Sequence, residues 1–461
     1  MPGWDKLKEI VRLEIIQKKE EGADVQGFFE EYENAGDDEQ KLKELYDKLF
    51  LLEPEQSIAS KEPSELEEIR KQRTDGLRKL KIKFDENKLM DKFYGAWIGR
   101  CAGCALGKPL EAGPFMAGTK SNPGWKNVKL WFEGADAWPI KGYVPIHSRA
   151  QEEHGINISE WCTKSTRENI KYMESDDDIR YTILGLWLME QKGLEWDSWD
   201  VGVTWHCLLP YAYVCTAETQ AYYNFANVVT HMDRSKPSDW KEKINWVRSY
   251  MNPYREWIGA QIRVDSYGYC AAGNPELAAE LAWRDASFSH VKNGIYGAMF
   301  MSALISAAFV EDNPYKQVEI ALSEIPAQSR LAYAIKKAVE IASNEKHQVN
   351  LVEKIWNEFN HYHCVHTINN AALCAASIIF AQGDFEKAIT TAVLGGWDTD
   401  CNGATVGSVM GAMLGASNIP DYWSAPLNDM IYSSVAGFDP ISISECAKRT
   451  YEVFKKINRS I

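Results

Sequence analysis

Two aspartates, Asp398 and Asp400, lie two residues apart in a glycine-rich turn, and a run of small residues follows them. In that run a glycine recurs at every fourth position from Gly403 to Gly415. On a helix this spacing places the glycines along one slowly drifting stripe, where a second backbone can approach closely. An interior glycine destabilises a helix by roughly 1 kcal/mol relative to alanine, so we expect tight packing along the stripe. Two ionised carboxylates at the end of a buried helix require compensation, and a divalent cation with oxygen ligands is the first hypothesis.

A second acidic group, Ser175-Asp-Asp-Asp178, runs directly into the apolar segment 179–189. Serine and aspartate stabilise the first turn of a helix, so one interpretation is a well-capped helix that begins here. Three consecutive aspartates exceed what capping needs. Together with the serine hydroxyl they are typical of half of a site for a hard cation.

A second glycine series, with the same four-residue spacing, extends from Gly95 to Gly107 and is followed by Pro109 and Glu111. Two such series in one chain predict two central helices that cross face to face. This crossing would bring Glu111 and Asp398 towards the same end of a helical bundle.

The rest of the chain indicates an all-α fold. Residues 1–90 are rich in Lys and Glu with helical periodicity, and we expect a helical extension that is either a solvated layer docked on the main domain or a partner-binding module. The main domain is expected over residues 91–461. Strand patterns in it are weak and never sustained. Its later helices are expected at Pro275–Arg284, Gly294–Val310, Val318–Leu322, Ser329–Ala342, Leu351–Phe359, Thr367–Phe380, Phe385–Leu394 and Ser442–Ile457.

Residues 112–170 are rich in Gly, Pro, Trp and Tyr and show little periodicity. We expect a long irregular excursion, and segments of this length in a compact protein are usually lids or binding loops. Its aromatic side chains could cover a pocket or could bury the excursion against the N-terminal helices. These residues are Trp125, Trp131, Trp138, Tyr143 and Trp161.

The composition limits the classes of partner. The 461 residues include 51 basic and 65 acidic side chains, and the net charge of −14 disfavours nucleic acid and anionic membranes as partners. The first residues carry charges at once and no apolar run reaches spanning length, so a cytoplasmic protein is expected.

The ten cysteines are scattered and suit reduced core thiols. Cys101 and Cys104 form a Cys-x-x-Cys whose small neighbours favour a tight helix over a redox or zinc site. The oligomeric state is left open.

Three motifs now carry a resemblance to a known family. They are Ala105-Leu-Gly-Lys-Pro-Leu-Glu111, then Ser175-Asp-Asp-Asp178, then Gly395-Gly-Trp-Asp-Thr-Asp-Cys401. Their order and wide separation resemble the ADP-ribosylglycohydrolase family, which includes ADP-ribosylarginine hydrolases and the dinitrogenase reductase-activating glycohydrolase. The resemblance extends from about residue 91 to the end of the chain. It implies a compact multi-helix bundle and leaves the N-terminal extension unexplained.

The resemblance also implies a pair of Mg²⁺ ions, with Mn²⁺ as the alternative metal. The implied metal ligands are Ser175, Asp176, Asp177, Asp398 and Asp400. Three residues depart from the family pattern. Cys401 stands where a threonine hydroxyl is usual, and sulfur is a poor ligand for Mg²⁺. Trp397 separates the glycine pair from Asp398, and Asp178 replaces a threonine, which affects the expected substrate more than the metal site.

The implied reaction is metal-dependent hydrolysis of the glycosidic bond of an ADP-ribosyl, or related ribosyl, group on a protein or a small molecule. Glu111, Asp177 and Asp400 are the catalytic candidates. A weaker match implies that Ile258 and Gly259 bind the diphosphate of the substrate through backbone N–H groups.

A similar weak match places His290 near the substrate, although a lone histidine is often structural. His361, His363 and His366 have spacing suggestive of zinc, but the first two would point to different faces of a helix. Two other functions stay open: a small nucleoside or glycoside hydrolase of the same fold, and a non-catalytic ADP-ribose-binding protein.

Overall fold

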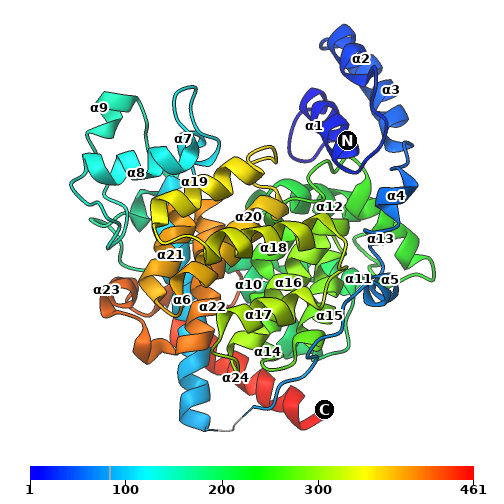
Figure 1. Ribbon diagram of the computed structural model, residues 1–461. Coiled ribbons are helices and arrows are strands. Elements are labelled where there is room, and N and C mark those ends of the chain that lie inside the picture. The colour runs from blue at the N-terminus through cyan, green and yellow to red at the C-terminus, as the bar shows by residue number, and fades with distance from the viewer. Residues whose placement is uncertain (83–84, 461) are drawn as a thin grey trace.

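A computed structural model describes residues 1–82 and 85–460, and helices dominate it (Figure 1). The described residues form only one small antiparallel sheet, in which β1 (Met430–Ile431) pairs with β2 (Ile441–Ser442). The all-α prediction is therefore confirmed. No helix among the described residues combines the length and the apolar character that crossing a membrane would require.

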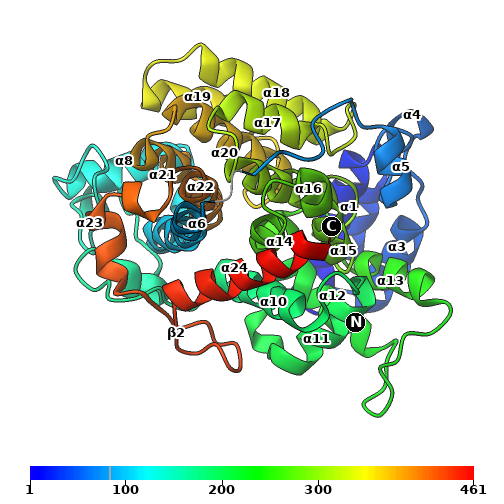
Figure 2. The same ribbon diagram turned by 90° about the horizontal axis from the view of Figure 1, so that it is seen from below.

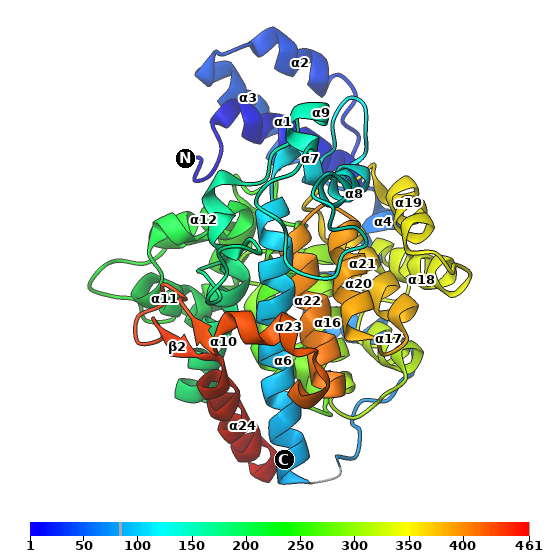
Figure 3. The same cartoon turned by 90° about the vertical axis from the view of Figure 1, so that its left-hand side faces the viewer.

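The two glycine series lie on the central pair of helices, α6 (Glu86–Gly107) and α22 (Thr399–Leu414). The helices run antiparallel, so that Gly95 faces Gly411 and Gly103 faces Gly403. A Cβ atom added at any of these four glycines would lie less than 3.0 Å from the backbone of the opposite helix. Figures 2 and 3 show the pair side by side in the middle of the molecule. The predicted face-to-face crossing is therefore present, and it requires glycine because the backbones themselves are in contact.

The other helices of the main body surround this pair. Those expected between residues 275 and 394 and at the C-terminus are present, with bounds that differ by a few residues. They are α15 (Pro275–Ala286), α16 (Lys292–Ala308), α17 (Pro314–Leu322), α18 (Arg330–Ser343), α19 (Gln348–Phe359), α20 (Thr367–Ala381), α21 (Phe385–Leu394) and α24 (Ile443–Ser460). The remaining helices of the main body are α10 (Asp177–Lys192), α11 (Ser198–Leu208), η3 (Tyr211–Tyr213), α12 (Thr216–Ala226), α13 (Trp240–Ser249), η4 (Ile258–Arg263), α14 (Asp265–Cys270), η5 (Ala416–Asn418), α23 (Asp421–Ser424) and η6 (Ala425–Leu427).

The described N-terminal residues, 1–82, form five helices, of which the first three sit on one end of the main body and the other two lie along its side (Figure 1). They are α1 (Leu7–Glu20), α2 (Phe28–Ala35), α3 (Glu39–Phe50), α4 (Gln56–Ala59) and α5 (Leu66–Lys71). The first three helices share a small apolar cluster that Met251 of the main body completes. The backbone N–H of Met251 donates to the Tyr46 hydroxyl at 2.6 Å. The extension is thus docked through both apolar and polar contacts, while the domain boundary at residue 90 stays a prediction.

The excursion over residues 112–170 is more regular than we expected. It contains α7 (Gly113–Met116), α8 (Gly124–Gly134), α9 (Ala150–His154) and η2 (Glu160–Ser165). Trp131 and Tyr143 are buried in the main core, and the Tyr143 hydroxyl donates to the Trp423 carbonyl at 2.5 Å. Of the two alternatives left open for the aromatic side chains, Trp131 and Tyr143 are buried, in the main core, while the lid role of the excursion stays a prediction. Trp161 is the exception, because 91% of its surface is exposed.

Candidate active site

Three helix ends meet at the acidic motifs. Helix α6 ends at Gly107 and continues into the turn η1 (Lys108–Leu110), which leads to Glu111. The N-terminus of α22 lies beside this end, because the Cβ position of Gly107 abuts the backbone of Thr399. Helix α10 begins directly after Asp176, whose side chain accepts a hydrogen bond from the N–H of Asp178 at 3.0 Å. Acidic side chains at two helix N-termini are favoured by the helix dipoles.

The turn before α22 explains the position of Trp397. Gly396 and Trp397 both have positive φ values, of 72° and 59°. This conformation is unfavourable for a residue with a Cβ atom, by roughly 1–2 kcal/mol. The indole ring is buried and stacks on Trp356 with a centroid distance of 5.0 Å and an interplanar angle of 14°. The stacking stabilises a tight turn that places Asp398 at the start of the helix.

Carboxylates from all three motifs come together. The ligand atoms of Glu111, Asp398 and Asp400 lie within 4.8 Å of one another, and the same holds for Asp178, Asp400 and Cys401. Glu111 reaches solvent, whereas Asp398 and Asp400 are buried. The crossing of the glycine helices therefore brings Glu111 and Asp398 to one end of the bundle, as the sequence predicted.

The electrostatics of this group indicate uncompensated negative charge. Burial and the charge of Asp176 raise the pKa of Asp400 to about 7. Burial and the charges of Asp400 and Glu111 raise the pKa of Asp398 well above its usual range. Desolvation by the surrounding protein, and then Asp400, raise the pKa of Glu111 in the same way. Such a group is stabilised either by bound protons or by a bound cation.

The donor atoms on the Asp400 side fit one divalent cation. One carboxylate oxygen of Asp400, Oδ1, and one of Asp178, Oδ2, are buried and have no hydrogen-bond partner within the described parts of the chain. Unsatisfied buried oxygens of this kind are rare in proteins and require an explanation. Oxygen ligands suit Mg²⁺ or Mn²⁺, whereas the Cys401 thiol does not.

Three basic side chains near the acidic motifs were missed by the sequence analysis. Lys108 forms a buried ion pair with Asp176, and Arg180 donates to the Ser175 hydroxyl at 2.7 Å. Arg100 of α6 is fully buried and pairs with Asp178 at 3.0 Å. The position of Lys108 inside the motif that ends at Glu111 was a signal that could have revealed it. Arg100 approaches Asp178 only through the tertiary fold.

Comparison with protein families decides the relationship. The model of the ADP-ribosylglycohydrolase family matches residues 85–457. The chain belongs to the ADP-ribosylglycohydrolase family. No curated protein matches the chain. Among solved structures, one described as an "ADP-ribosylglycohydrolase-related protein complex" is 17% identical, covers 80% of this chain and 99% of its own, and has a TM-score of 0.44.

The ADP-ribosylglycohydrolase motifs account for the acidic residues, but Ile258 and Gly259 lie in different surroundings. The N–H of Ile258 donates to the Val365 carbonyl at 2.9 Å, so it is not free to bind a phosphate. A Cβ atom at Gly259 would collide with the Glu218 carboxylate, and a nearby carboxylate repels a diphosphate. The diphosphate role of these two residues remains a prediction, and the structure offers no support for it.

His290 is fully buried one residue after Ser289, and its Nδ1 lies 2.8 Å from the Ser289 hydroxyl. Burial, and then the charge of Arg263, lower the pKa of His290 well below its usual range, so the ring is neutral. Arg263 also pairs with Glu218 and Asp285. His290 thus belongs to a buried polar cluster, and its substrate role stays a prediction.

The histidines between residues 361 and 366 and the Cys-x-x-Cys pair, which were considered for metal or redox chemistry, pack within the fold. His363 stacks on Trp257 with a centroid distance of 4.1 Å, and the His366 side chain accepts a hydrogen bond at the N-terminus of α20. Cys101 and Cys104 are buried on α6, and all ten cysteines, which lie within the described residues, are free thiols.

Proposed function

We propose that this protein is a metal-dependent glycoside hydrolase that cleaves an ADP-ribosyl, or related ribosyl, group from a protein or a small-molecule acceptor. The observation that carries the proposal is the convergence of Glu111, Asp398 and Asp400 at the end of the glycine-packed helix pair. Their charges are left uncompensated by the protein, and their positions match the family motifs. The proposed metal is Mg²⁺, with Mn²⁺ as the alternative.

Asp398 and Asp400 are the residues that would hold the cation, with Glu111 beside them. A bound divalent ion polarises oxygen ligands and lowers the pKa of water, which suits attack on a sugar carbon that develops oxocarbenium character. Glu111 reaches solvent, so it can orient a ribose hydroxyl or transfer a proton. Asp177, which is only partly buried at the first turn of α10, and Asp400 are the two candidates for deprotonating the attacking water.

The direct test is to incubate the purified protein with three classes of substrate: ADP-ribosylarginine peptide, ADP-ribosylserine peptide and a small ADP-riboside. Release of free ADP-ribose is followed by liquid chromatography and mass spectrometry, with Mg²⁺, with Mn²⁺ and with EDTA. We expect release from at least one substrate, abolished by EDTA and by Asp398→Asn. Asp312→Asn is the matched control, because Asp312 is 85% exposed and makes only a long contact with Lys92.

The alternatives predict different results in the same experiment. A nucleoside or small-glycoside hydrolase would leave all three ADP-ribosides intact and hydrolyse a simple nucleoside in the presence of metal. A non-catalytic binding protein would bind ADP-ribose and release nothing. Either result would overturn the proposal. The cytoplasmic location and the absence of nucleic acid as a partner also remain predictions from the sequence.

A further inference from the structure

We propose that the Lys108 ammonium group takes the place of one cation of the expected pair, so that this protein holds a single divalent ion beside Asp398 and Asp400. The inference rests on the proposed function, because it concerns the metal that this function requires. It follows from a difference between the two halves of the acidic site. Lys108 and Arg180 contact the predicted ligands of one half, whereas Asp398 and Asp400 in the other half form no ion pair with a lysine or arginine among the described residues.

The satisfied half is formed by Ser175 and Asp176. Oδ2 of Asp176 pairs with Nζ of Lys108, and both side chains are at least 90% buried. Oδ1 of Asp176 accepts the N–H of Asp178 at 3.0 Å. Both oxygens of this carboxylate are therefore occupied, and one of them contacts a positive charge that an approaching metal ion would have to displace.

Ser175 is occupied in the same way. Its hydroxyl accepts a hydrogen bond from Nη1 of Arg180 at 2.7 Å and donates one to the Ser433 carbonyl at 3.2 Å. Lys108 and Arg180 thus place two positive charges among the predicted metal ligands of this half. A divalent cation here would be repelled by both charges, because charge repulsion is strong in a buried site.

The other half has the opposite character. Within the described chain, no lysine or arginine forms an ion pair with Asp398 or Asp400. The buried Oδ1 of Asp400 has no hydrogen-bond partner in the same part of the chain. Asp178 beside it pairs with Arg100 through Oδ1, and its Oδ2 has no partner there either. These oxygens are therefore available as ligands for one cation.

One departure from the family pattern acts in the same direction as Lys108. Cys401 supplies a thiol where the pattern has a hydroxyl, and its sulfur lies within 4.8 Å of ligand oxygens of Asp178 and Asp400. A thiol removes one hard ligand for Mg²⁺, whereas Lys108 adds one fixed positive charge. The Cys401 thiol and the Lys108 charge both reduce the number of divalent ions that the site can hold.

The experiment counts bound ions and does not depend on turnover. Wild-type protein is equilibrated with Mn²⁺ alone, and bound manganese is measured by equilibrium dialysis with elemental analysis and by electron paramagnetic resonance. We expect one ion per chain and no spin coupling between manganese ions. Lys108→Ala combined with Cys401→Thr should bind two ions per chain and show a coupled manganese pair.

Lys129→Ala is the control, since Lys129 forms a partly exposed pair with Glu133 away from the acidic motifs, and it should still bind one ion. Circular dichroism verifies that each variant is folded. If the double variant does not fold, the wild-type count decides alone. Two ions in wild-type protein, or one in the folded double variant, would overturn the inference while leaving metal-dependent hydrolysis intact. No bound ion in wild-type protein would contradict the proposed function as well.

Discussion

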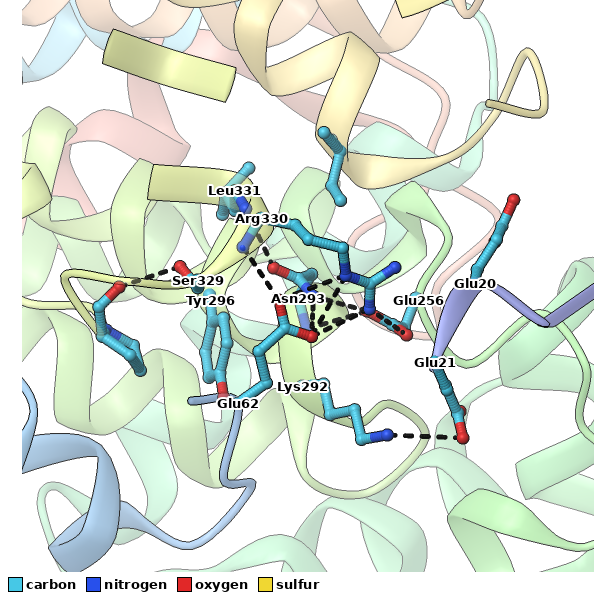
Figure 4. Close-up of polar contacts among 12 residues, drawn as sticks. Glu20, Glu21, Glu62, Glu256, Lys292, Asn293, Tyr296, Ser329, Arg330 and Leu331 are labelled. Atoms are coloured by element: carbon cyan, nitrogen blue, oxygen red, sulfur yellow. Dashed lines mark hydrogen bonds and ion pairs between the residues drawn. The ribbon is translucent and has the colours of Figure 1, made fainter. Parts of the chain in front are cut away.

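The interface between the N-terminal helices and the main body also buries carboxylates, but there Glu14, Glu21, Glu62 and Glu256 each have a basic partner. Arg330 of α18 contacts Glu62 at 2.9 Å and Glu256 at 2.8 Å (Figure 4). Arg255 contacts Glu14 at 2.8 Å and Glu21 at 2.8 Å. These pairs join segments that are distant in the sequence.

The two clusters respond differently to burial. Burial alone would raise the pKa of Glu256, but the charges of Arg330 and Lys292 outweigh it and lower the pKa. At the active site the pKa of Asp398 is raised, because burial and the neighbouring carboxylates act together. Buried carboxylates that are paired with basic side chains hold the structure together, whereas buried carboxylates without such partners form a site that can bind a cation.

The largest expected effect comes from breaking the balanced cluster. Arg255→Ala should lower the free energy of unfolding by about 3–5 kcal/mol, because it leaves Glu14 buried without its ion-pair partner and leaves Glu21 paired with Lys292 alone. Urea denaturation measures the change. Arg149→Ala removes an exposed pair with Asp136 and should change the free energy of unfolding far less, because solvent screens this pair. Equal effects of the two substitutions would show that the interface cluster contributes no more than a surface pair.

Removal of a charged group at the active site should have the opposite effect on the free energy of unfolding when no metal is bound. Asp398→Asn removes one charge from a self-repelling group, so the metal-free protein should be unchanged or more stable by about 1 kcal/mol. Wild-type protein should gain about 2.7 kcal/mol at a metal concentration one hundred times the dissociation constant, and the variant should gain none. Thermal melting with and without Mg²⁺ gives both values. A strongly destabilised metal-free variant would place Asp398 among the structural charges.

A smaller effect is expected at the thiol. Cys401→Thr returns an oxygen beside Asp178 and Asp400 and should tighten Mg²⁺ binding up to about tenfold, or roughly 1.4 kcal/mol. Calorimetric titration of the variant tests this expectation. Weaker Mg²⁺ binding in a folded variant would assign the thiol a role that the present account lacks.

The smallest effect concerns Glu20, the least compensated carboxylate near the interface. Burial, and then the charge of Glu256, raise its pKa to about 7. Because the native state favours the protonated form, its contribution to stability is greatest below the unfolded pKa of about 4.5 and is lost as the pH rises through 7. Glu20→Gln should therefore reduce the decline in unfolding free energy between pH 4.5 and 8. An unchanged pH profile of urea denaturation would refute this.

Much of the fold was predictable because its signals are local. Four-residue glycine spacing predicted the contact between α6 and α22, and the serine–aspartate run predicted the start of α10. The excursion was less predictable, because the burial of Tyr143 depends on Trp423, which lies far along the chain. Non-local pairing also hid the ion pairs of Lys108 and Arg100 with the acidic motifs and the carboxylate beside Gly259.

The central claim is that the carboxylates of Asp398 and Asp400, which have no ion-pair partner among the described residues, bind a catalytic cation. Calorimetric titration of metal-free protein with Mg²⁺ or Mn²⁺, in the absence and presence of ADP-ribose, tests it most directly. We predict saturable binding by wild-type protein, tighter binding when ADP-ribose is present, and no binding by Asp398→Asn. Wild-type protein that shows no saturable metal binding under either condition would contradict the account.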